Sequence, residues 1–233
     1  SSIAADLNEG DTVSLTLSGS ASGEIGASVS GVGGKASGSV SRTRTVTVER
    51  GKDRHGAPVV QVTVAFDDAQ SGTLANTVGI DEASAAAQRT GSRSQGRTEV
   101  VYLDPDAPDY DTTYDALLRT TSPAELTALV DTLSDNQRGS RTTRTGTGHT
   151  DSISAESGSL KVESHATAKG SEAVTEDGGE WHAEASQRSG YGGSVTFGGE
   201  GVAGGGRTGE AKVEVEGDGR AEVLVSQGVS TVS

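Results

Sequence analysis

The first long pattern in the chain is an alternation of small or apolar residues with polar ones. From Val13 to Val29 every odd-numbered position holds Val, Leu, Ile, Ala or Gly, and most even-numbered positions hold Ser or Thr. Because alternate residues of a strand point to opposite faces, this period of two predicts a strand with one apolar and one hydroxyl-rich face. An average strand has about 5 or 6 residues, so this strand is predicted to be unusually long.

The alternation resumes after the Gly-rich residues 31–34 and continues to Val48. A two-residue turn at Val32-Gly33 would set Leu17 opposite Val48 and would bring the apolar residues of both strands to one face. Arg42 and Arg44 also fall on this apolar face. The two stretches together predict a long antiparallel hairpin.

The rest of the N-terminal part continues in the same way. A turn over residues 51–56 leads into an alternating strand at residues 60–66, and a further strand at residues 98–103 stops before Asp104-Pro105. Between them the Ala-rich residues 81–88 suit a short helix, whereas the surrounding Ser, Thr and Gly suit a hairpin. We favour a hairpin with an irregular tip, which makes this part an antiparallel meander.

The middle of the chain changes to a helical period. Ser122-Pro123-Ala124-Glu125 is a capping box with proline at the first helical position, and Leu126, Leu129, Val130 and Leu133 follow at helical spacing. A shorter helix is predicted over residues 112–119, capped by Asp111 or Thr112. We expect the two helices to pack on the apolar face of the sheet.

Alternating strands return from Arg138, with turns predicted near Gly158, Gly178-Gly179, Gly204-Gly205-Gly206 and Gly217-Asp218-Gly219. The patterns together predict a mainly β fold, in which long-stranded antiparallel meander sheets carry a central two-helix insert. The parts are an N-terminal meander of long hairpins at residues 1–110, a helical insert at 111–139 and a C-terminal meander at 140–233. One continuous domain is the alternative to this division.

Composition limits the core and the partners. Val, Leu, Ile and Phe supply only 42 of 233 residues, about 18%, and the net charge is −14, which is a combination typical of disordered chains. Small side chains bury little area, so we expect partner chains to complete the core. Few aromatic residues argue against a deep small-molecule pocket, and the acidic balance argues against nucleic acid as a partner.

The chain contains no Cys, which excludes disulfides and thiolate metal sites, and no Met even at its first position. We therefore expect it to be cut from a longer polypeptide. No apolar run is long enough for a transmembrane helix, and the first ten residues do not resemble a signal peptide.

One acidic cluster has chemical interest. Asp104, Asp106, Asp109 and Asp111 lie close together in a loop, and carboxylates on a loop are suitable Ca²⁺ ligands, although the spacing is not that of an EF-hand. The alternative is structural, with the prolines ending a strand and an Asp capping a helix. No other cofactor is predicted.

The remaining motifs are weak. His55, His149, His165 and His182 have no metal-ligand spacing and are interpreted as solvated. Three matches to the dinucleotide-binding glycine string begin at Gly31, Gly199 and Gly204, but none opens a helix after a strand, so they are discounted.

The stretch Glu24–Val48 (EIGASVSGVGGKASGSVSRTRTVTV) and the stretch Tyr191–Phe197 (YGGSVTF) resemble the Gly/Ser/Val-rich β-modules of large secreted bacterial toxin-like proteins. The resemblance is one of texture and has no signature motif. It implies a stalk, translocation or delivery segment that is extracellular or at the cell surface, with any enzymatic domain elsewhere.

These observations predict a non-enzymatic structural or delivery module of a secreted bacterial assembly. Its expected partner is protein, either further copies of itself or other parts of a larger polypeptide. A pore-forming β-hairpin module is the main alternative and would bring in a membrane, although Arg42 and Arg44 on the apolar face weigh against it. A Ca²⁺-dependent adhesin is the third hypothesis.

Overall fold

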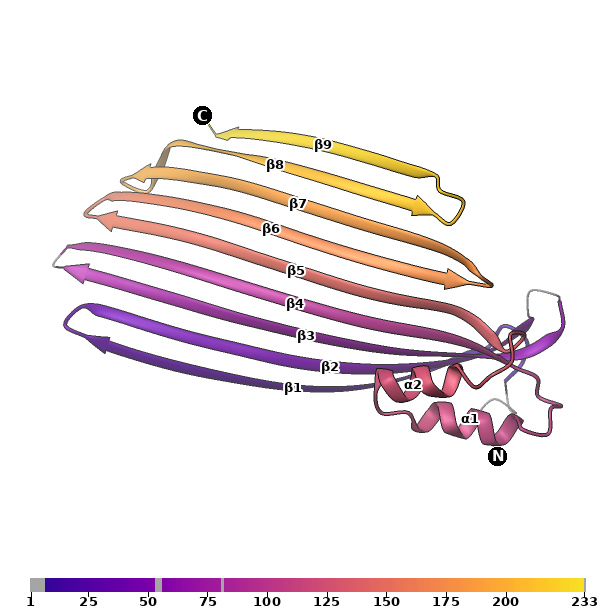
Figure 1. Cartoon of the computed structure of the whole chain (residues 1–233). Helices are drawn as coiled ribbons and strands as arrows, with labels where there is room; N and C mark the ends of the chain where they lie inside the picture. Colours follow the sequence, from indigo (N-terminus) through magenta and orange to yellow (C-terminus); the bar gives the residue numbers. More distant parts are fainter. Residues whose placement is uncertain (1–6, 53–55, 81, 233) are drawn as a thin grey trace.

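The computed structural model describes residues 7–52, 56–80 and 82–232 and confirms the predicted fold class. It is a single antiparallel meander sheet in which nine strands lie side by side in chain order (Figure 1). Two helices are inserted between the fourth and fifth strands, and these two strands pair directly, so one sheet runs through the whole chain. The elements are β1 (Thr12–Val29), β2 (Val32–Lys52), β3 (Pro58–Ile80), β4 (Ala83–Leu103), α1 (Tyr110–Arg119), α2 (Pro123–Val130), β5 (Arg138–Ser157), β6 (Leu160–Asp177), β7 (Glu180–Phe197), β8 (Glu200–Glu216) and β9 (Ala221–Val232).

The first hairpin has the predicted faces but a different register. Its turn is at Ser30-Gly31, with φ values of 49° and 79°, rather than at Val32-Gly33. Leu17 therefore lies opposite Arg44 instead of Val48. Glycine is required at position 31 because its φ is positive and a Cβ there would come within 2.3 Å of the Gly79 carbonyl oxygen. The register moves by an even number of residues, so every side chain keeps its predicted face.

The two faces of the sheet differ in chemistry. We call the face that carries α1 and α2 the helix face; on β1 it holds the odd-numbered residues Val13 to Val29. The opposite face, which we call the hydroxyl face, holds Ser14, Thr16, Ser18 and the following even-numbered residues of β1. Serine and threonine hydroxyls pair across strands on this face, as between Ser14 and Thr47 at 3.1 Å.

The two helices pack on the apolar face of the sheet, as predicted. They cover only one end of this face (Figure 1). The buried core lies beneath them and consists of strand residues from β2, β3 and β4 together with residues of the helical insert. The members are Val46, Val48, Val60, Val62, Val64, Phe66, Val101, Leu103, Tyr114, Leu117, Leu126, Val130 and Leu133. Away from the helices apolar side chains are exposed, for example Leu74 on β3 at 59% and Ile25 on the neighbouring edge strand β1 at 79%.

Local signals explain most of the helical insert. Ser122 caps α2 by accepting a hydrogen bond from the Glu125 backbone N–H, as the capping box predicts, although the Glu125 carboxylate accepts from the backbone N–H of Thr121 rather than of Ser122. The shorter helix α1 begins earlier than predicted, with Asp109 at the N-cap and no side-chain cap bond, so the predicted caps Asp111 and Thr112 lie inside it. Leu133 follows α2 but still enters the core.

Residues 67–80 and 83–96 pair as β3 and β4, so this part is a hairpin rather than a helix, as we favoured; the predicted irregular tip includes residue 81, which lies outside the described residues. The predicted turn at residues 204–206 is wrong. These glycines lie inside β8, and the turn is at Gly198-Gly199, where both φ values are positive, at 61° and 88°. Of the predicted turn at residues 51–56, Gly51 and Lys52 instead belong to β2, and residues 53–55, with His55 among them, lie outside the described residues.

The position of the core predicts where the stability resides. Leu103→Ala in β4, at a side chain that is 1% exposed, should lower the free energy of unfolding by about 2–5 kcal/mol through lost burial and a residual cavity. The matched change Leu74→Ala on the neighbouring strand should cost less than about 0.5 kcal/mol because this side chain is exposed. Chemical denaturation of both variants measures the difference, and equal losses would contradict a core confined to the helix end.

Candidate interaction surface

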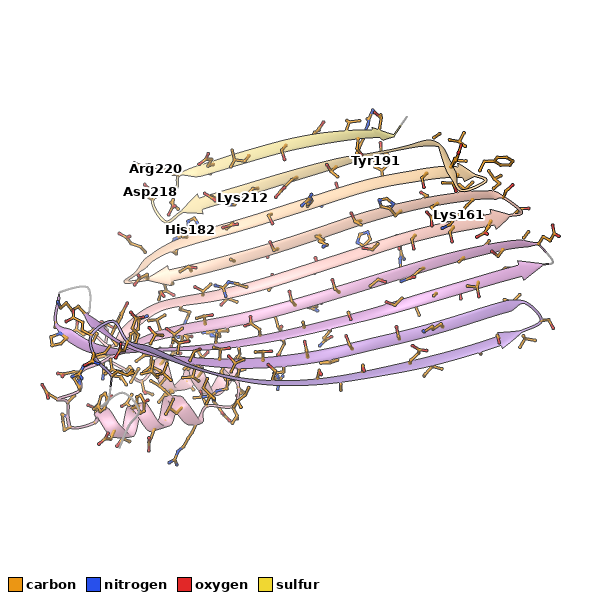
Figure 2. The ribbon with its side chains drawn as sticks, turned by 180° about the vertical axis from the view of Figure 1, so that it is seen from behind. Lys161, His182, Tyr191, Lys212, Asp218 and Arg220 are labelled. Atoms are coloured by element: carbon orange, nitrogen blue, oxygen red, sulfur yellow. The ribbon has the colours of Figure 1, made fainter. Side chains whose placement is uncertain are left out.

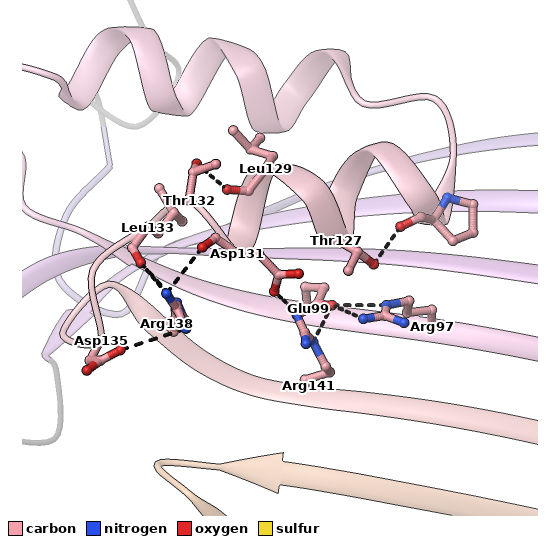
Figure 3. Close-up of polar contacts among 11 residues, drawn as sticks. Arg97, Glu99, Thr127, Leu129, Asp131, Thr132, Leu133, Asp135, Arg138 and Arg141 are labelled. Carbon is pink, nitrogen blue, oxygen red and sulfur yellow. Dashed lines mark hydrogen bonds and ion pairs between the residues drawn. The ribbon is translucent and has the colours of Figure 1, made fainter.

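A buried carboxylate links the sheet to the helical insert (Figure 3). Glu99 of β4 is 2% exposed and points into the helix face beneath α2. Its Oε1 accepts hydrogen bonds from Arg97 Nε and Nη2 at 3.0 and 2.8 Å and from Arg141 Nε at 2.8 Å. Arg141 Nη2 also donates to Asp131 Oδ1 at 2.7 Å, so β4, β5 and the end of α2 are joined through one guanidinium. A buried charge needs such pairing, since an unpaired one is costly.

A third arginine, Arg138, holds the loop that follows α2. Arg138 Nε and Nη2 donate to the Leu133 carbonyl oxygen at 2.9 and 2.8 Å, and Arg138 Nη1 lies 3.7 Å from Asp135 Oδ1 (Figure 3). Glu99, Asp131, Arg138 and Arg141 line a polar hollow of about 440 Å³. The charged groups of these residues pair with one another, and Arg138 pairs with Asp135. We therefore interpret them as a structural clamp between the sheet and the helices.

Arg44 has a comparable role on β2. The sequence places it on the apolar face, and the structure shows why the charge is tolerated there. Its Nη2 donates to the carbonyl oxygens of Leu117 and Leu118 in the last turn of α1, at 3.2 and 2.7 Å, where a cation complements the helix dipole. The guanidinium lies 5.9 Å from the centroid of the Phe66 ring. Partial burial lowers the pKa of Arg44.

The structure does not gather the predicted calcium ligands. Asp104 lies after β4, and its Oδ1 accepts the backbone N–H of Asp106 at 2.9 Å; Asp109 is the N-cap of α1 and Asp111 lies in its first turn. Among the described residues no three His, Cys, Asp or Glu side chains are arranged to hold a metal ion. The arrangement therefore favours the structural interpretation of this loop.

The described histidines lie on strands. His149 and His165 are exposed. The third, His182 of β7, is partly buried and places Nδ1 2.9 Å from Glu216 Oε1 on β8. Nearby on β8, Lys212 bridges Glu184 and Glu214 on the hydroxyl face, and Figure 2 shows Lys212 and His182 on adjacent strands. The His182–Glu216 and Lys212–Glu184 contacts join β7 to β8 and support their register, whereas Lys212 and Glu214 lie on the same strand.

Beyond the helices the helix face mixes charged pairs with exposed apolar residues. Arg42 Nε donates to Asp68 Oδ1, and Arg89 Nε donates to Asp151 Oδ1, both at 2.7 Å. The carboxyl pKa values of Asp68 and Asp151 are lowered chiefly by these hydrogen bonds. Each pair bridges two adjacent strands.

The two edges of the sheet are the least protected parts of the described chain. β1 and β9 each have a neighbour on one side only (Figure 1). Natural edge strands are commonly guarded by lysine, proline, bulges or covering loops. β1 contains neither Lys nor Pro and has one charged residue, Glu24, whose carboxylate is 2.8 Å from Lys35 Nζ; β9 has only Glu222. Both edges offer a row of free backbone groups beside exposed apolar side chains.

A scan of the chain against protein-family models finds no match, and a search of curated proteins finds none either. No helix among the described residues is long and apolar enough to cross a membrane.

The ion pairs predict sensitivity to acid. The hydrogen bond from Arg141 lowers the pKa of Asp131 in the folded chain. A lowered folded pKa contributes stability above the unfolded pKa, and this stability is lost as the pH falls below about 4. The melting temperature of Asp131→Asn should therefore fall less between pH 5 and pH 2 than that of the unchanged chain. Thr132→Ala, which removes no carboxyl group, is the control, and an identical acid profile for Asp131→Asn and the unchanged chain would contradict this assignment.

Proposed function

We propose that this chain is a non-enzymatic structural module whose sheet is completed by pairing with another protein chain. The observation that carries the proposal is the pair of unguarded edges on β1 and β9, each with a full row of unpaired backbone groups. Such edges are templates for strand addition.

The distribution of apolar side chains supports the same conclusion. The sheet is a single layer, and the described core lies where the helices cover it. Large apolar residues along the rest of the sheet are exposed to solvent. They include Leu17, Leu74, Ile153, Tyr191 and Val225. Extended exposed apolar surface marks interaction sites in soluble proteins. The Glu99 carboxylate and the guanidinium groups of Arg138 and Arg141, which line the polar hollow, are engaged in hydrogen bonds within the clamp.

The charges on the helix face argue against the pore-forming alternative. Arg42, Asp68, Arg89 and Asp151 lie on the less polar face of the long strands, which is the face that a pore would turn toward lipid. An arginine on the lipid face costs about 2–4 kcal/mol at the bilayer midplane. Membership of a secreted bacterial toxin-like protein, and an extracellular location, stay predictions of the sequence resemblance.

Assembly is tested by the mass in solution. Light scattering on a sizing column should give a defined mass above the 23.4 kDa of one chain. The melting temperature should rise with protein concentration, because association stabilises the folded state by mass action. A monomer that melts cooperatively at the same temperature over a wide concentration range would overturn the proposal.

Dye release from liposomes tests the alternative. We expect no leakage from vesicles of anionic or neutral lipid at neutral or acidic pH. Leakage that Leu17→Lys abolishes would instead support insertion of the hairpins, since this substitution adds a charge to the helix face of β1.

A further inference from the structure

We propose that β1 is the interface of a symmetric dimer, in which it pairs antiparallel with β1 of a second copy of this chain, with Ala21 on the two-fold axis. The inference rests on the proposed function, because it names the partner and the edge that complete the sheet.

The hairpin turn determines which backbone groups of β1 are free. In a two-residue hairpin the residues that flank the turn, here Val29 and Val32, exchange both backbone hydrogen bonds. Odd-numbered residues of β1 thus direct N–H and C=O toward β2, and even-numbered residues direct theirs outward. The free groups of the edge belong to Ser14 and every second residue up to Ser28.

The side chains of β1 on the helix face are arranged almost symmetrically about Ala21. Reading outward in either direction, the strand has Gly, then a large aliphatic residue, and ends in Val; the positions are Val13, Leu15, Leu17, Gly19, Ala21, Gly23, Ile25, Ala27 and Val29. In an antiparallel pair of identical strands each residue lies opposite the residue equally far from the axis on the other side, so this symmetry brings side chains of similar size together. Pairing of β1 with β2 inside one chain does not, since the two strands differ in sequence.

The symmetry selects one register. With Ala21 opposite Ala21 of the second copy, Leu17 lies opposite Ile25, Val13 opposite Val29 and Gly19 opposite Gly23. A shift by two residues in either direction keeps the outward backbone groups paired but leaves a large aliphatic residue opposite a glycine. In the symmetric register the even-numbered residues are the hydrogen-bonded pairs, as their outward groups require, and the apolar residues are the close, non-hydrogen-bonded pairs.

Exposure and charge are compatible with this pairing. Leu15 and Leu17 are 56% and 54% exposed, so the helices leave β1 uncovered. Glu24 falls opposite Ser18 of the second copy, and the two Glu24 carboxylates are six residues apart along the strands, about 20 Å. Because the strands run in opposite directions, the helices of the two copies lie at opposite ends of the combined sheet. The paired residues 13–29 extend over about 60 Å.

The other edge lacks these properties. On β9 the helix-face residues are Ala221, Val223, Val225, Gln227, Val229 and Thr231. In the two self-pairings that overlap most of this strand, Gln227 lies opposite either Val225 or Gln227 of the second copy, so each places a polar amide at the centre of the valines. Two-fold dimers are also the commonest closed homo-oligomers.

Single cysteines test the axis directly, since the chain has none of its own. In the proposed dimer the two Ala21 Cα atoms form a non-hydrogen-bonded pair about 4.5 Å apart, within the range of a disulfide. Ala21→Cys should therefore convert to a covalent dimer under mild oxidation, seen on a non-reducing gel as twice the 23.4 kDa of one chain. Two variants should stay uncrosslinked. In Ser20→Cys the two cysteines are offset from each other by two residues along the paired strands, and Val225→Cys lies on β9, away from the proposed interface.

Each other outcome overturns the inference in a recognisable way. Crosslinking of Val225→Cys without Ala21→Cys would place the interface on β9, and a multimer in which neither links would place it elsewhere; in both cases the proposed assembly function stands. A chain of 23.4 kDa at all concentrations, with no crosslink, would overturn both proposals.

A backbone variant provides the second test. The N–H of Ser20 points outward, so Ser20→Pro removes a donor of the dimer without breaking the β1–β2 ladder, and proline is tolerated on such an edge. The mass should fall from that of two chains to that of one, with the circular dichroism spectrum unchanged. Ser20→Ala keeps the N–H and should keep the dimer. A dimer that survives Ser20→Pro would contradict the pairing.

Discussion

The ladder of backbone hydrogen bonds between neighbouring long strands is the interaction on which the rest of this structure depends. Residues such as Ser18, Gly38 and Ala86 are too small to hold two layers of structure together. Most of the sheet has no second layer over it. Peptide groups pair irrespective of side-chain size, so a chain poor in large aliphatic residues still forms strands of 17 to 23 residues over most of its length. The same ladder leaves one unsatisfied row at each edge of the sheet.

The helical insert supplies what the ladder lacks, namely a buried core. It concentrates leucines above β3 and β4, and three arginines bind it to the sheet, one from β2 and two from β5. Arg44 holds the end of α1, Arg141 holds the end of α2 through Asp131, and Arg138 holds the loop that follows. One end of the sheet is therefore anchored like an ordinary domain, while the other end is a single layer. An assembly through the edges would extend this layer without disturbing the anchored end.

The sequence was informative where a pattern had one solution. Period-two alternation predicted the faces of the strands, and the capping box at Ser122 predicted the start of α2. Turns within Gly-rich stretches were not determined, because an even shift of register leaves the alternation unchanged, and because Gly204-Gly205-Gly206 suits a turn as well as Gly198-Gly199 does. Glu99 was missed, although a signal existed. It lies on the same face of its strand as the buried residues Val101 and Leu103, and a carboxylate on a buried face requires polar partners. The identity of those partners, Arg97 and Arg141, depends on the pairing of β4 with β5.

The agreement between strand order and chain order has a consequence for how the molecule reaches this state. Every strand pairs only with the strands before and after it in the chain, and only the β4–β5 pairing must close around the two helices. Sheets whose contacts are local in sequence avoid the entropy of closing long loops. The chain can thus add its strands in order from either end, as a polypeptide does when it emerges gradually from a ribosome or a narrow channel, with β1 available for pairing before β9 exists.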